Sequence, residues 1–353
     1  MDMLSEKLGK IYREAGADVL YTTTDYLRRY LTGFPSSDGF VLVDGNGCTF
    51  VTDMRYAEAA QKSLEGSGIQ VVVGTVAKAE EMLSPYRSVG VPYSLTPYPE
   101  LLQLQRWGHE TVDSMLAFKN AMIIKSEEEL RSISKACEIA EDAFNALLPE
   151  IKEGMTETEV AALLEYNMRK RGASGTSFDT ICAFGAHGSV PHYETGNTKL
   201  KFGDAILIDF GCKVDGYCSD ITRTFLFGDD GKHGDFKKAY QEVLAAHLLV
   251  QETLAAGMTG KQADAIARES LQKAGLGEAF THSLGHGIGL NIHESPNLSP
   301  RSEDVLLDGM VFSDEPGVYF AGEFGIRIED SVTLKDGRVS SFMKKTRKDL
   351  VIL

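Results

Sequence analysis

The chain has 353 residues, of which 43% are hydrophobic and 25% charged, and its formal net charge at pH 7 is −15. This composition is that of a globular protein large enough for two domains. The acidic excess argues against binding to nucleic acid or to anionic lipid, because phosphate groups would be repelled.

The N-terminal segment and the cysteines favour a cytoplasmic location. The first twenty residues lack the apolar core of a signal peptide, and no apolar run in the sequence approaches the roughly 20 residues that span a bilayer. The five cysteines are scattered, without a CxxC pair. We therefore expect reduced thiols, a cytoplasmic location and no membrane partner.

Short strands and helices alternate through residues 1 to about 120. Residues 39–53 predict a β-hairpin, because two apolar runs flank an Asp-Gly-Asn-Gly turn. The following elements are a helix over 56–66, which ends at a glycine, and strands over 70–74 and 89–93. Prolines at 92, 97 and 99 then predict a connecting segment. No catalytic pattern is found in this half.

Amphipathic helices open the second half. Ser126 and Glu129 have capping-box spacing at the start of a helix over 124–151, and a second helix with the same pattern is predicted over 156–172. Strand-rich sequence follows to about 227. Two further helices, over 234–256 and 260–274, precede a strand-rich section that begins at 280. This order of helix pairs and strand groups suggests an internal duplication.

The segment LIDFGCKVDGYCSDITRTF (207–225) predicts a second hairpin with two aspartates in its apolar runs. Asp215-Gly216 is typical of a two-residue type I′ turn, which places Asp209 opposite Thr222 and Asp220 opposite Gly211. The two aspartates then share one face as diagonal neighbours, with Cβ atoms within about 7–8 Å. Gly211 would leave space above the sheet between them.

Two half-buried carboxylates this close repel one another, and a divalent cation would remove that cost. Oxygen ligands suit Mg²⁺, Ca²⁺ or Mn²⁺. The alternative is a surface hairpin whose apolar face packs on the core and whose aspartates are solvated. The hairpin alone leaves both interpretations open.

Further candidate ligands lie towards the C-terminus. In the strand–loop–strand unit over 310–332, pairing of Tyr319 with Gly325 would place Glu315 opposite Glu329, although Glu329 could instead pair with Arg327 or another cation on a surface strand. His192, His282, His286 and His293 lie in or near turns, and glycines bracket His286. For any single histidine a structural role is the alternative, but the whole set points to a two-metal hydrolytic site.

Seven motifs resemble the pita-bread metallopeptidases, a group that includes methionine aminopeptidase, aminopeptidase P and prolidase. In order they are SFDTI (177–181), PHYE (191–194), LIDFG (207–211), SDITRTF (219–225), GHGIGLNIHE (285–294), EPGVY (315–319) and GIRIED (325–330). Residues 25–43 and 52–56 resemble a creatinase-type N-terminal domain, which favours prolidase or aminopeptidase P.

The resemblance implies an α+β fold with two domains. A smaller α/β creatinase-like domain over residues 1–122 would precede a pita-bread catalytic domain over 123–353. The catalytic domain would have a curved antiparallel sheet flanked by helices, with pseudo-twofold symmetry. A homodimer is also implied.

The resemblance further implies a set of site residues. Two divalent metals would be bound, with Mn²⁺ favoured and Co²⁺ or Zn²⁺ as alternatives, by Asp209, Asp220, His286, Glu315 and Glu329. Asp220 and Glu329 would bridge the metals, and Glu315 would also accept a proton. His192 and His293 would lie near the scissile bond, and Arg327 would be the arginine of the site.

The expected activity is hydrolysis of the Xaa-Pro bond at the N-terminus of dipeptides or short peptides, by a dipeptidase or an aminopeptidase. Two alternatives remain, a metal-independent creatinase-like C–N hydrolase and a non-catalytic peptide-binding module. One departure from the family pattern is Ser313-Asp314 before the Glu-Pro pair, where a Thr and an apolar residue are usual. By strand alternation Asp314 should point away from the site, and His187 has no assigned role.

Overall fold

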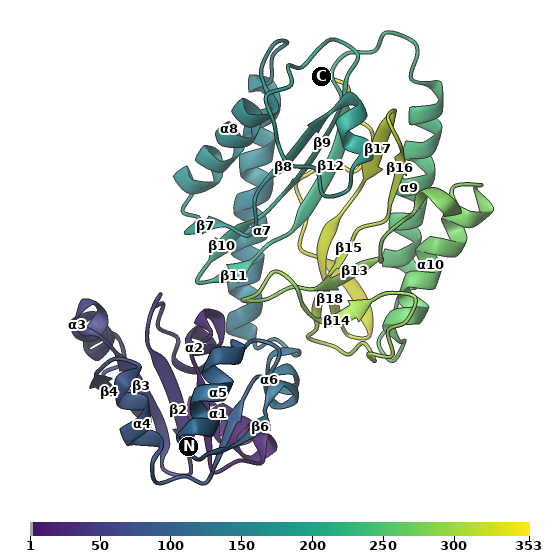
Figure 1. The fold of residues 1–353 in the computed structure, drawn as a ribbon. Coiled ribbons are helices and arrows are strands. Elements are labelled where there is room, and N and C mark those ends of the chain that lie inside the picture. The colour runs from purple at the N-terminus through teal and green to yellow at the C-terminus, as the bar shows by residue number, and fades with distance from the viewer. Residues whose placement is uncertain (1–2) are drawn as a thin grey trace. The chain divides into compact units, whose positions relative to one another are not determined.

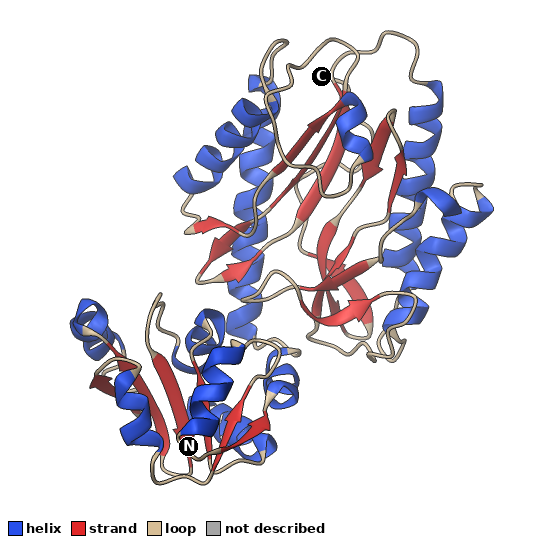
Figure 2. Cartoon of the chain, in the orientation of Figure 1, coloured by secondary structure: helices blue, strands red, loops and turns tan. Residues whose placement is uncertain are grey.

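The computed structural model describes residues 3–353, and the chain divides into two compact units, one ending at Met122 and the other spanning Ile123–Leu353. Each is a mixed structure of helices and sheets (Figure 2). Within residues 3–353, no helix has both the length and the apolar character needed to cross a membrane.

The first unit is built on a six-stranded mixed sheet of order β4-β3-β2-β1-β5-β6 (Figure 1). The β1–β2 and β2–β3 pairs are antiparallel, and the other three pairs are parallel. Its strands are β1 Val19–Thr22, β2 Phe40–Asp44, β3 Gly47–Thr52, β4 Ile69–Val73, β5 Ser88–Val91 and β6 Glu110–Asp113. Its helices are α1 Met3–Ala15, α2 Asp25–Thr32, α3 Met54–Ser63, α4 Ala77–Leu83, α5 Tyr98–Arg106 and α6 Met115–Met122.

The predicted hairpin of this unit is confirmed as β2–β3. Asp44 pairs with Gly47 across the turn, and its Oδ1 accepts hydrogen bonds from the backbone of Asn46 and Gly47. The predicted connecting segment after the prolines is wrong, because that stretch forms α5, β6 and α6. Pro97 is the N-cap of α5 and Pro99 lies in its first turn, where a missing N–H costs nothing.

The second unit has two pairs of long helices and strands between them (Figure 1). The helices are α7 Glu127–Leu147, α8 Glu157–Lys170, α9 Gly234–Thr253 and α10 Gly260–Lys273. The strands before α9 are β7 Gly175–Thr176, β8 Ile181–Phe184, β9 Ala205–Phe210, β10 Cys212–Val214, β11 Tyr217–Cys218 and β12 Ile221–Leu226. Those after α10 are β13 Gly285–Gly287, β14 Glu294–Leu298, β15 Val311–Asp314, β16 Gly317–Phe320, β17 Phe324–Arg327, β18 Asp330–Lys335 and β19 Arg338–Ser341.

Helix starts in this unit follow the predicted capping boxes. Ser126 and Thr156 each accept a hydrogen bond from the backbone nitrogen three residues on, and the glutamate there accepts one from the backbone nitrogen of the cap residue. One core cluster joins α7 and α8 to β8, β9 and β12, and a second joins α9 and α10 to the later strands. The repeated order of helix pair and strand group therefore gives the pita-bread architecture that the sequence predicts.

The two strand groups meet where β12 lies beside the segment after β17. Thr224 Oγ1 donates to the backbone oxygen of Arg327 (3.0 Å) and accepts from its backbone nitrogen (3.1 Å). The backbone nitrogen of Glu329 donates to Thr222 O (3.1 Å). These bonds bring side chains from both halves of the unit to one place.

Candidate active site

The hairpin with the two aspartates has the predicted register. Val214 pairs with Tyr217, and Asp215 and Gly216 between them have φ of 49° and 84°, as a type I′ turn requires. Thr222 pairs with Asp209, and both aspartates line a cavity of about 450 Å³.

The expected reason for Gly211 is wrong in detail. A Cβ at this position would lie 1.9 Å from the backbone oxygen of Ser219, so the glycine permits a close backbone approach and does not leave open space. The backbone nitrogen of Ser219 donates to Cys212 O (3.0 Å), and the two strands are interrupted here. The close approach therefore belongs to the bend between β9–β12 and β10–β11.

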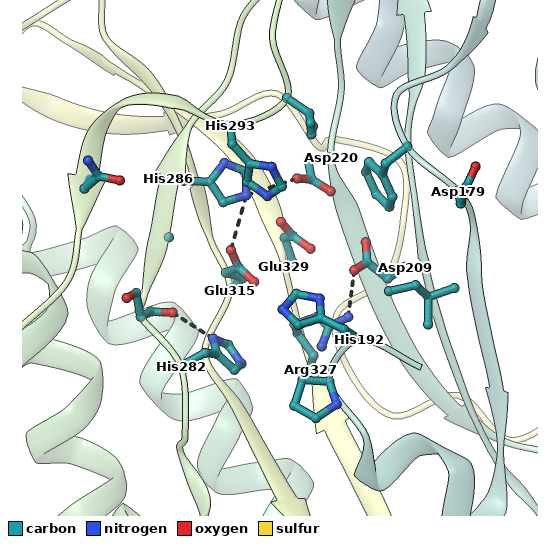
Figure 3. A pocket seen from close by; sticks show the side chains of 17 residues that line it. Asp179, His192, Asp209, Asp220, His282, His286, His293, Glu315, Arg327 and Glu329 are labelled. Carbon is teal, nitrogen blue, oxygen red and sulfur yellow. Dashed lines mark hydrogen bonds and ion pairs between the residues drawn. The ribbon is translucent and has the colours of Figure 1, made fainter. Parts of the chain in front are cut away.

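The two glutamates come from the second half of the unit. Tyr319 pairs with Gly325, as predicted, and Asp314 pairs with Asp330 on the other side of the glutamates. Glu315 and Glu329 both line the cavity (Figure 3). Asp314 is fully buried and its Oδ2 lies 3.1 Å from His247 Nδ1 in α9, so it points away from the cavity, as alternation predicts.

His286 is placed by the glycines on either side. A Cβ at Gly285 would lie 2.0 Å from Ser313 O, and one at Gly287 would lie 2.3 Å from Ser295 O. The backbone of β13 therefore lies closer to the neighbouring backbones than a residue with a side chain would permit. His286 Nδ1 is 3.1 Å from the backbone oxygen of Gly287, which leaves Nε2 facing the carboxylates.

All five predicted metal ligands therefore surround one point (Figure 3). His286 Nε2 lies 3.5 Å from Asp220 Oδ2 and 3.6 Å from Glu315 Oε1. One carboxylate oxygen each from Asp209, Asp220 and Glu329 lie within 4.8 Å of one another. Asp209 Oδ1 is buried and has no hydrogen-bond partner. Such a donor set, with an unsatisfied buried oxygen, fits hard divalent cations.

Ionisation of all the carboxyl groups in this buried cluster is unfavourable when no cation balances their charge. Burial, followed by repulsion from neighbouring carboxylates, raises the pKa of Asp220 and of Glu329 well above their usual values. Burial also raises the pKa of Glu315 to about 8, and it lowers the pKa of His286 to about 4. Each group is pushed towards its neutral form, and positive charge between the carboxylates would reverse this effect.

Arg327 is held at the wall of the cavity by three side chains. Its Nη2 donates to Asp209 Oδ2 (2.7 Å), Nη1 to Tyr319 Oη (2.6 Å) and Nε to Thr222 Oγ1 (3.0 Å). The guanidinium is nearly fully buried. Arg327 therefore orients Asp209. The alternative in which this arginine pairs with Glu329 is wrong, because its hydrogen bonds go to Asp209, Tyr319 and Thr222.

Three histidines line the remaining walls. His293 lies against His286, with ring centroids 4.3 Å apart, and burial followed by the charge of His192 lowers its pKa. His192 also lines the cavity and is exposed. The sequence by itself assigns no specific role to His282. Its Nε2 lies 2.8 Å from Tyr319 Oη, and burial lowers the pKa of the imidazole to about 4. A link from His282 through Tyr319 to Arg327 was not predicted, because it depends on contacts between different strands.

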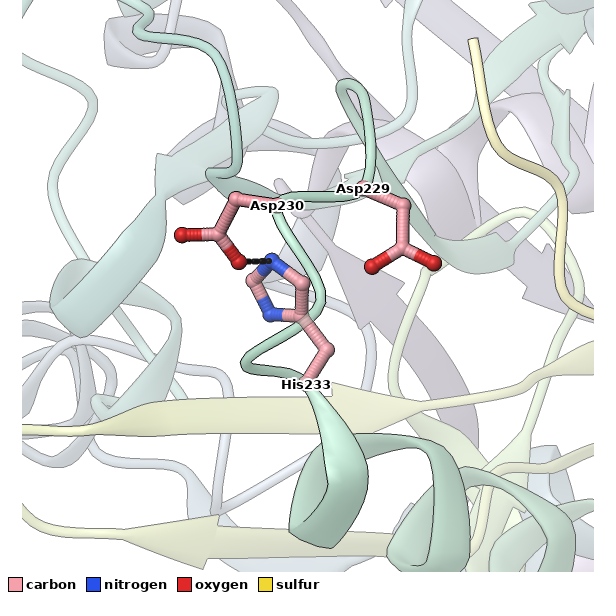
Figure 4. Close-up of side chains that lie close together, drawn as sticks. All are labelled: Asp229, Asp230 and His233. Carbon is pink, nitrogen blue, oxygen red and sulfur yellow. Dashed lines mark ion pairs between the residues drawn. The ribbon is translucent and has the colours of Figure 1, made fainter.

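A second acidic cluster lies outside this cavity. Asp229, Asp230 and His233 are close together before α9 (Figure 4). Asp229 forms an ion pair with Lys237, and Asp230 with Lys232. The positive charge of each lysine neutralises its aspartate, so this cluster has the character of an ordinary charged surface patch.

Comparison with known proteins agrees with this geometry. Residues 131–336 match metallopeptidase family M24, and residues 5–121 match the creatinase/prolidase N-terminal domain. The Xaa-Pro dipeptidase of Pyrococcus horikoshii is 36% identical over 99% of this chain and 100% of its own.

Two solved structures are similar over nearly their whole length. The Xaa-Pro dipeptidase from Bacillus anthracis superposes with a TM-score of 0.93 at 35% identity, covering 99% of this chain and 100% of that one. The X-Pro aminopeptidase from Thermotoga maritima has a TM-score of 0.88 at 32% identity, covering 97% and 99%. From its fold, its clustered acidic residues and these matches, this chain belongs to metallopeptidase family M24 and carries a creatinase/prolidase N-terminal domain.

Proposed function

We propose that this metallopeptidase hydrolyses the Xaa-Pro bond at the N-terminus of dipeptides or short peptides with two divalent cations. The observation that supports this proposal best is the convergence of four carboxylates and His286 on one cavity, from segments in both halves of the second unit. The similar proteins named above act on Xaa-Pro substrates by their names.

The residues that would hold the cations are Asp209, Asp220, His286, Glu315 and Glu329. Bound there, divalent cations would polarise the substrate carbonyl and acidify water. Four carboxylates and one imidazole favour Mn²⁺ over softer metals, with Co²⁺ or Zn²⁺ as alternatives in vitro.

Glu315 is the proposed proton acceptor. Ser313 Oγ donates to its Oε1 (3.0 Å), which fixes the carboxylate at the cavity wall. A general base must be ionised to accept a proton, and positive charge between the carboxylates would counteract the burial that raises the pKa of this carboxyl. Glu315 would take a proton from the attacking water and return it to the departing proline nitrogen.

His293 and His192 are proposed to contact the substrate on either side of the scissile bond. A neutral His293, favoured by its burial, can donate one hydrogen bond to the developing oxyanion. His192, which also lines the cavity, can orient the substrate or assist protonation of the leaving nitrogen. Arg327 would act through Asp209 by holding that carboxylate in place.

The proline requirement follows from the backbone chemistry of the substrate. An Xaa-Pro bond has no N–H, so a site that holds peptides as paired strands handles it poorly. In this cavity, recognition would instead come from side chains on the walls. Whether the chain prefers dipeptides or longer peptides distinguishes a dipeptidase from an aminopeptidase.

One experiment tests these statements together. Protein purified without added metal is analysed for metal content and then assayed on Xaa-Pro and Xaa-Pro-Yaa peptides with Mn²⁺, Co²⁺ or Zn²⁺. Cleavage that needs metal and proline supports the proposal, and the ratio of the two rates assigns the length preference. Metal-free cleavage of a C–N bond would indicate the creatinase-like alternative, and peptide binding without cleavage would indicate a binding module.

The homodimer and the cytoplasmic location remain predictions. Sedimentation of the purified protein and fractionation of the source cells would test them.

A further inference from the structure

Glu157, the first residue of α8, is a buried carboxylate that faces the segment carrying His192. It is 0% exposed. Its Oε1 accepts from the backbone nitrogen of Phe184 (2.9 Å) and lies 2.8 Å from His187 Nδ1. Its Oε2 accepts from Tyr193 Oη (2.9 Å) and from the backbone nitrogen of Gly196 (3.3 Å). Each carboxylate oxygen therefore has two partners, about as many as it can accept.

The four partners lie on both sides of His192 in the sequence. Phe184 and His187 precede it, and Tyr193 and Gly196 follow it. The rings of His187 and Tyr193 also stack, with centroids 4.5 Å apart and an interplanar angle of 26°. One buried side chain thus ties both ends of a thirteen-residue segment to the start of α8.

The same segment is fixed from its other side by β17. A Cβ at Gly325 would lie 1.8 Å from the backbone oxygen of Gly188, so the two backbones touch where no larger residue fits. Two residues further along, β17 carries Arg327 into the cavity wall. Thr195 adds a tie, because its Oγ1 accepts from the backbone nitrogen of Cys182 (2.8 Å) and donates to Thr180 O (2.7 Å).

We propose that Glu157, with His187 and Tyr193, forms a positioning group that holds His192 at the substrate cavity. The proposal rests on the role given to His192 under the proposed function. His192 itself is exposed, so its place at the cavity is set by the anchored segment on either side of it. None of the three positioning residues lines the cavity, and their effect on catalysis would pass through His192.

Tyr193→Phe is the most informative variant, because it keeps the stacked ring and removes one hydrogen bond to the buried carboxylate. The hydrogen bond to the carboxylate stabilises the anchored position of the segment that carries His192. Its loss should therefore lower kcat/KM by about tenfold. The change should divide between kcat and KM in the same way as for His192→Ala. Glu157→Gln, which replaces an acceptor oxygen by a donor, should have a larger effect in the same direction.

A double-mutant cycle separates positioning from general stability. If Tyr193 acts through His192, Tyr193→Phe should cost nothing further in a His192→Ala background. An equal loss of kcat/KM in both backgrounds would overturn the proposal. Tyr217→Phe is the matched control, because Tyr217 Oη also donates to a glutamate at a helix start, Glu129 (2.8 Å), but does not line the cavity.

Hydrogen exchange gives a readout that does not depend on activity. Exchange over residues 184–197 should be faster in Tyr193→Phe than in the wild type, and unchanged in Tyr217→Phe. Unchanged exchange in Tyr193→Phe would overturn the anchoring. Absence of Xaa-Pro cleavage by the metal-loaded wild type would instead refute the proposed function, and hydrogen exchange would still decide whether Glu157 holds the segment.

Discussion

Replacement of His247 tests how the sheet behind the cavity's acidic cluster is held together. Asp314 and Asp330 face each other across β15 and β18, and both are fully buried. Like charges in direct opposition destabilise a strand pair. Asp330 forms ion pairs with Arg223 (2.9 Å) and Lys348 (2.8 Å), whereas the ion pair of Asp314 is with His247 (3.1 Å). His247→Gln therefore removes the cation that faces Asp314.

The size of the effect follows from the pKa of the imidazole. The pKa of His247 is raised from 6.5 to about 9; burial acts to lower it, and the charges of Asp314 and Asp330 outweigh the burial. That rise corresponds to about 3 kcal/mol of folding free energy. Because the folded-state pKa is the higher one, this stabilisation is complete below pH 6.5 and is lost as the pH rises through about 9. Breaking a buried pair by removing one partner costs a similar amount, about 3–5 kcal/mol.

The assay compares urea unfolding of the wild type and His247→Gln at pH 6, 8 and 9.5, in metal-free protein. Four of the five free cysteines are buried in the second unit, so their alkylation reports the unfolding of that unit alone. The difference in unfolding free energy should be about 3 kcal/mol at pH 6 and should shrink towards zero at pH 9.5. Titrating groups that do not contact His247 contribute equally to both proteins and largely cancel in the difference.

Two results would refute this reasoning. A difference that stays constant with pH would mean that His247 is neutral, as it would be when accepting a hydrogen bond from Gln251 Nε2, which lies 3.0 Å from its Nε2. A difference that grows with pH would reverse the sign of the linkage. Asp314→Asn is the control, because without the aspartate charge His247→Gln should cost less at pH 6 and pH 8, where the wild-type imidazole is charged.

Three further predictions concern the cavity and its walls. Asp220→Ala or Glu329→Ala should abolish both metal binding and metal-dependent cleavage, as measured by metal analysis and kcat/KM; full metal content with full activity would contradict the ligand assignment. Mn²⁺ at a hundred times its dissociation constant should raise the unfolding free energy of the wild type by about 2.7 kcal/mol for each cation bound, and either variant should lose most of this gain in thermal denaturation. Gly325→Ala should destabilise the second unit by about 1–3 kcal/mol, because its Cβ would meet the Gly188 carbonyl at 1.8 Å; wild-type stability on urea unfolding would show that the contact relaxes freely.

The sequence by itself determined features that depend on local geometry. The Asp215-Gly216 turn set the register of its hairpin, and with it the common face of Asp209 and Asp220, because two-residue turns leave little choice of pairing. The helix starts at Ser126 and Thr156 were equally local, since a cap and its partner lie three residues apart.

Only the tertiary structure decided which groups from distant segments meet. Arg327 orients Asp209, 118 residues away, and His247 reaches Asp314 from a helix on the far side of the sheet. Gly211 is required by the close approach of another backbone, a reason that no turn rule contains. Glu157 and the His192 segment likewise carry no spacing signal. Such contacts arise from the packing of strands and helices against one another, and periodicity along one segment holds no information about them.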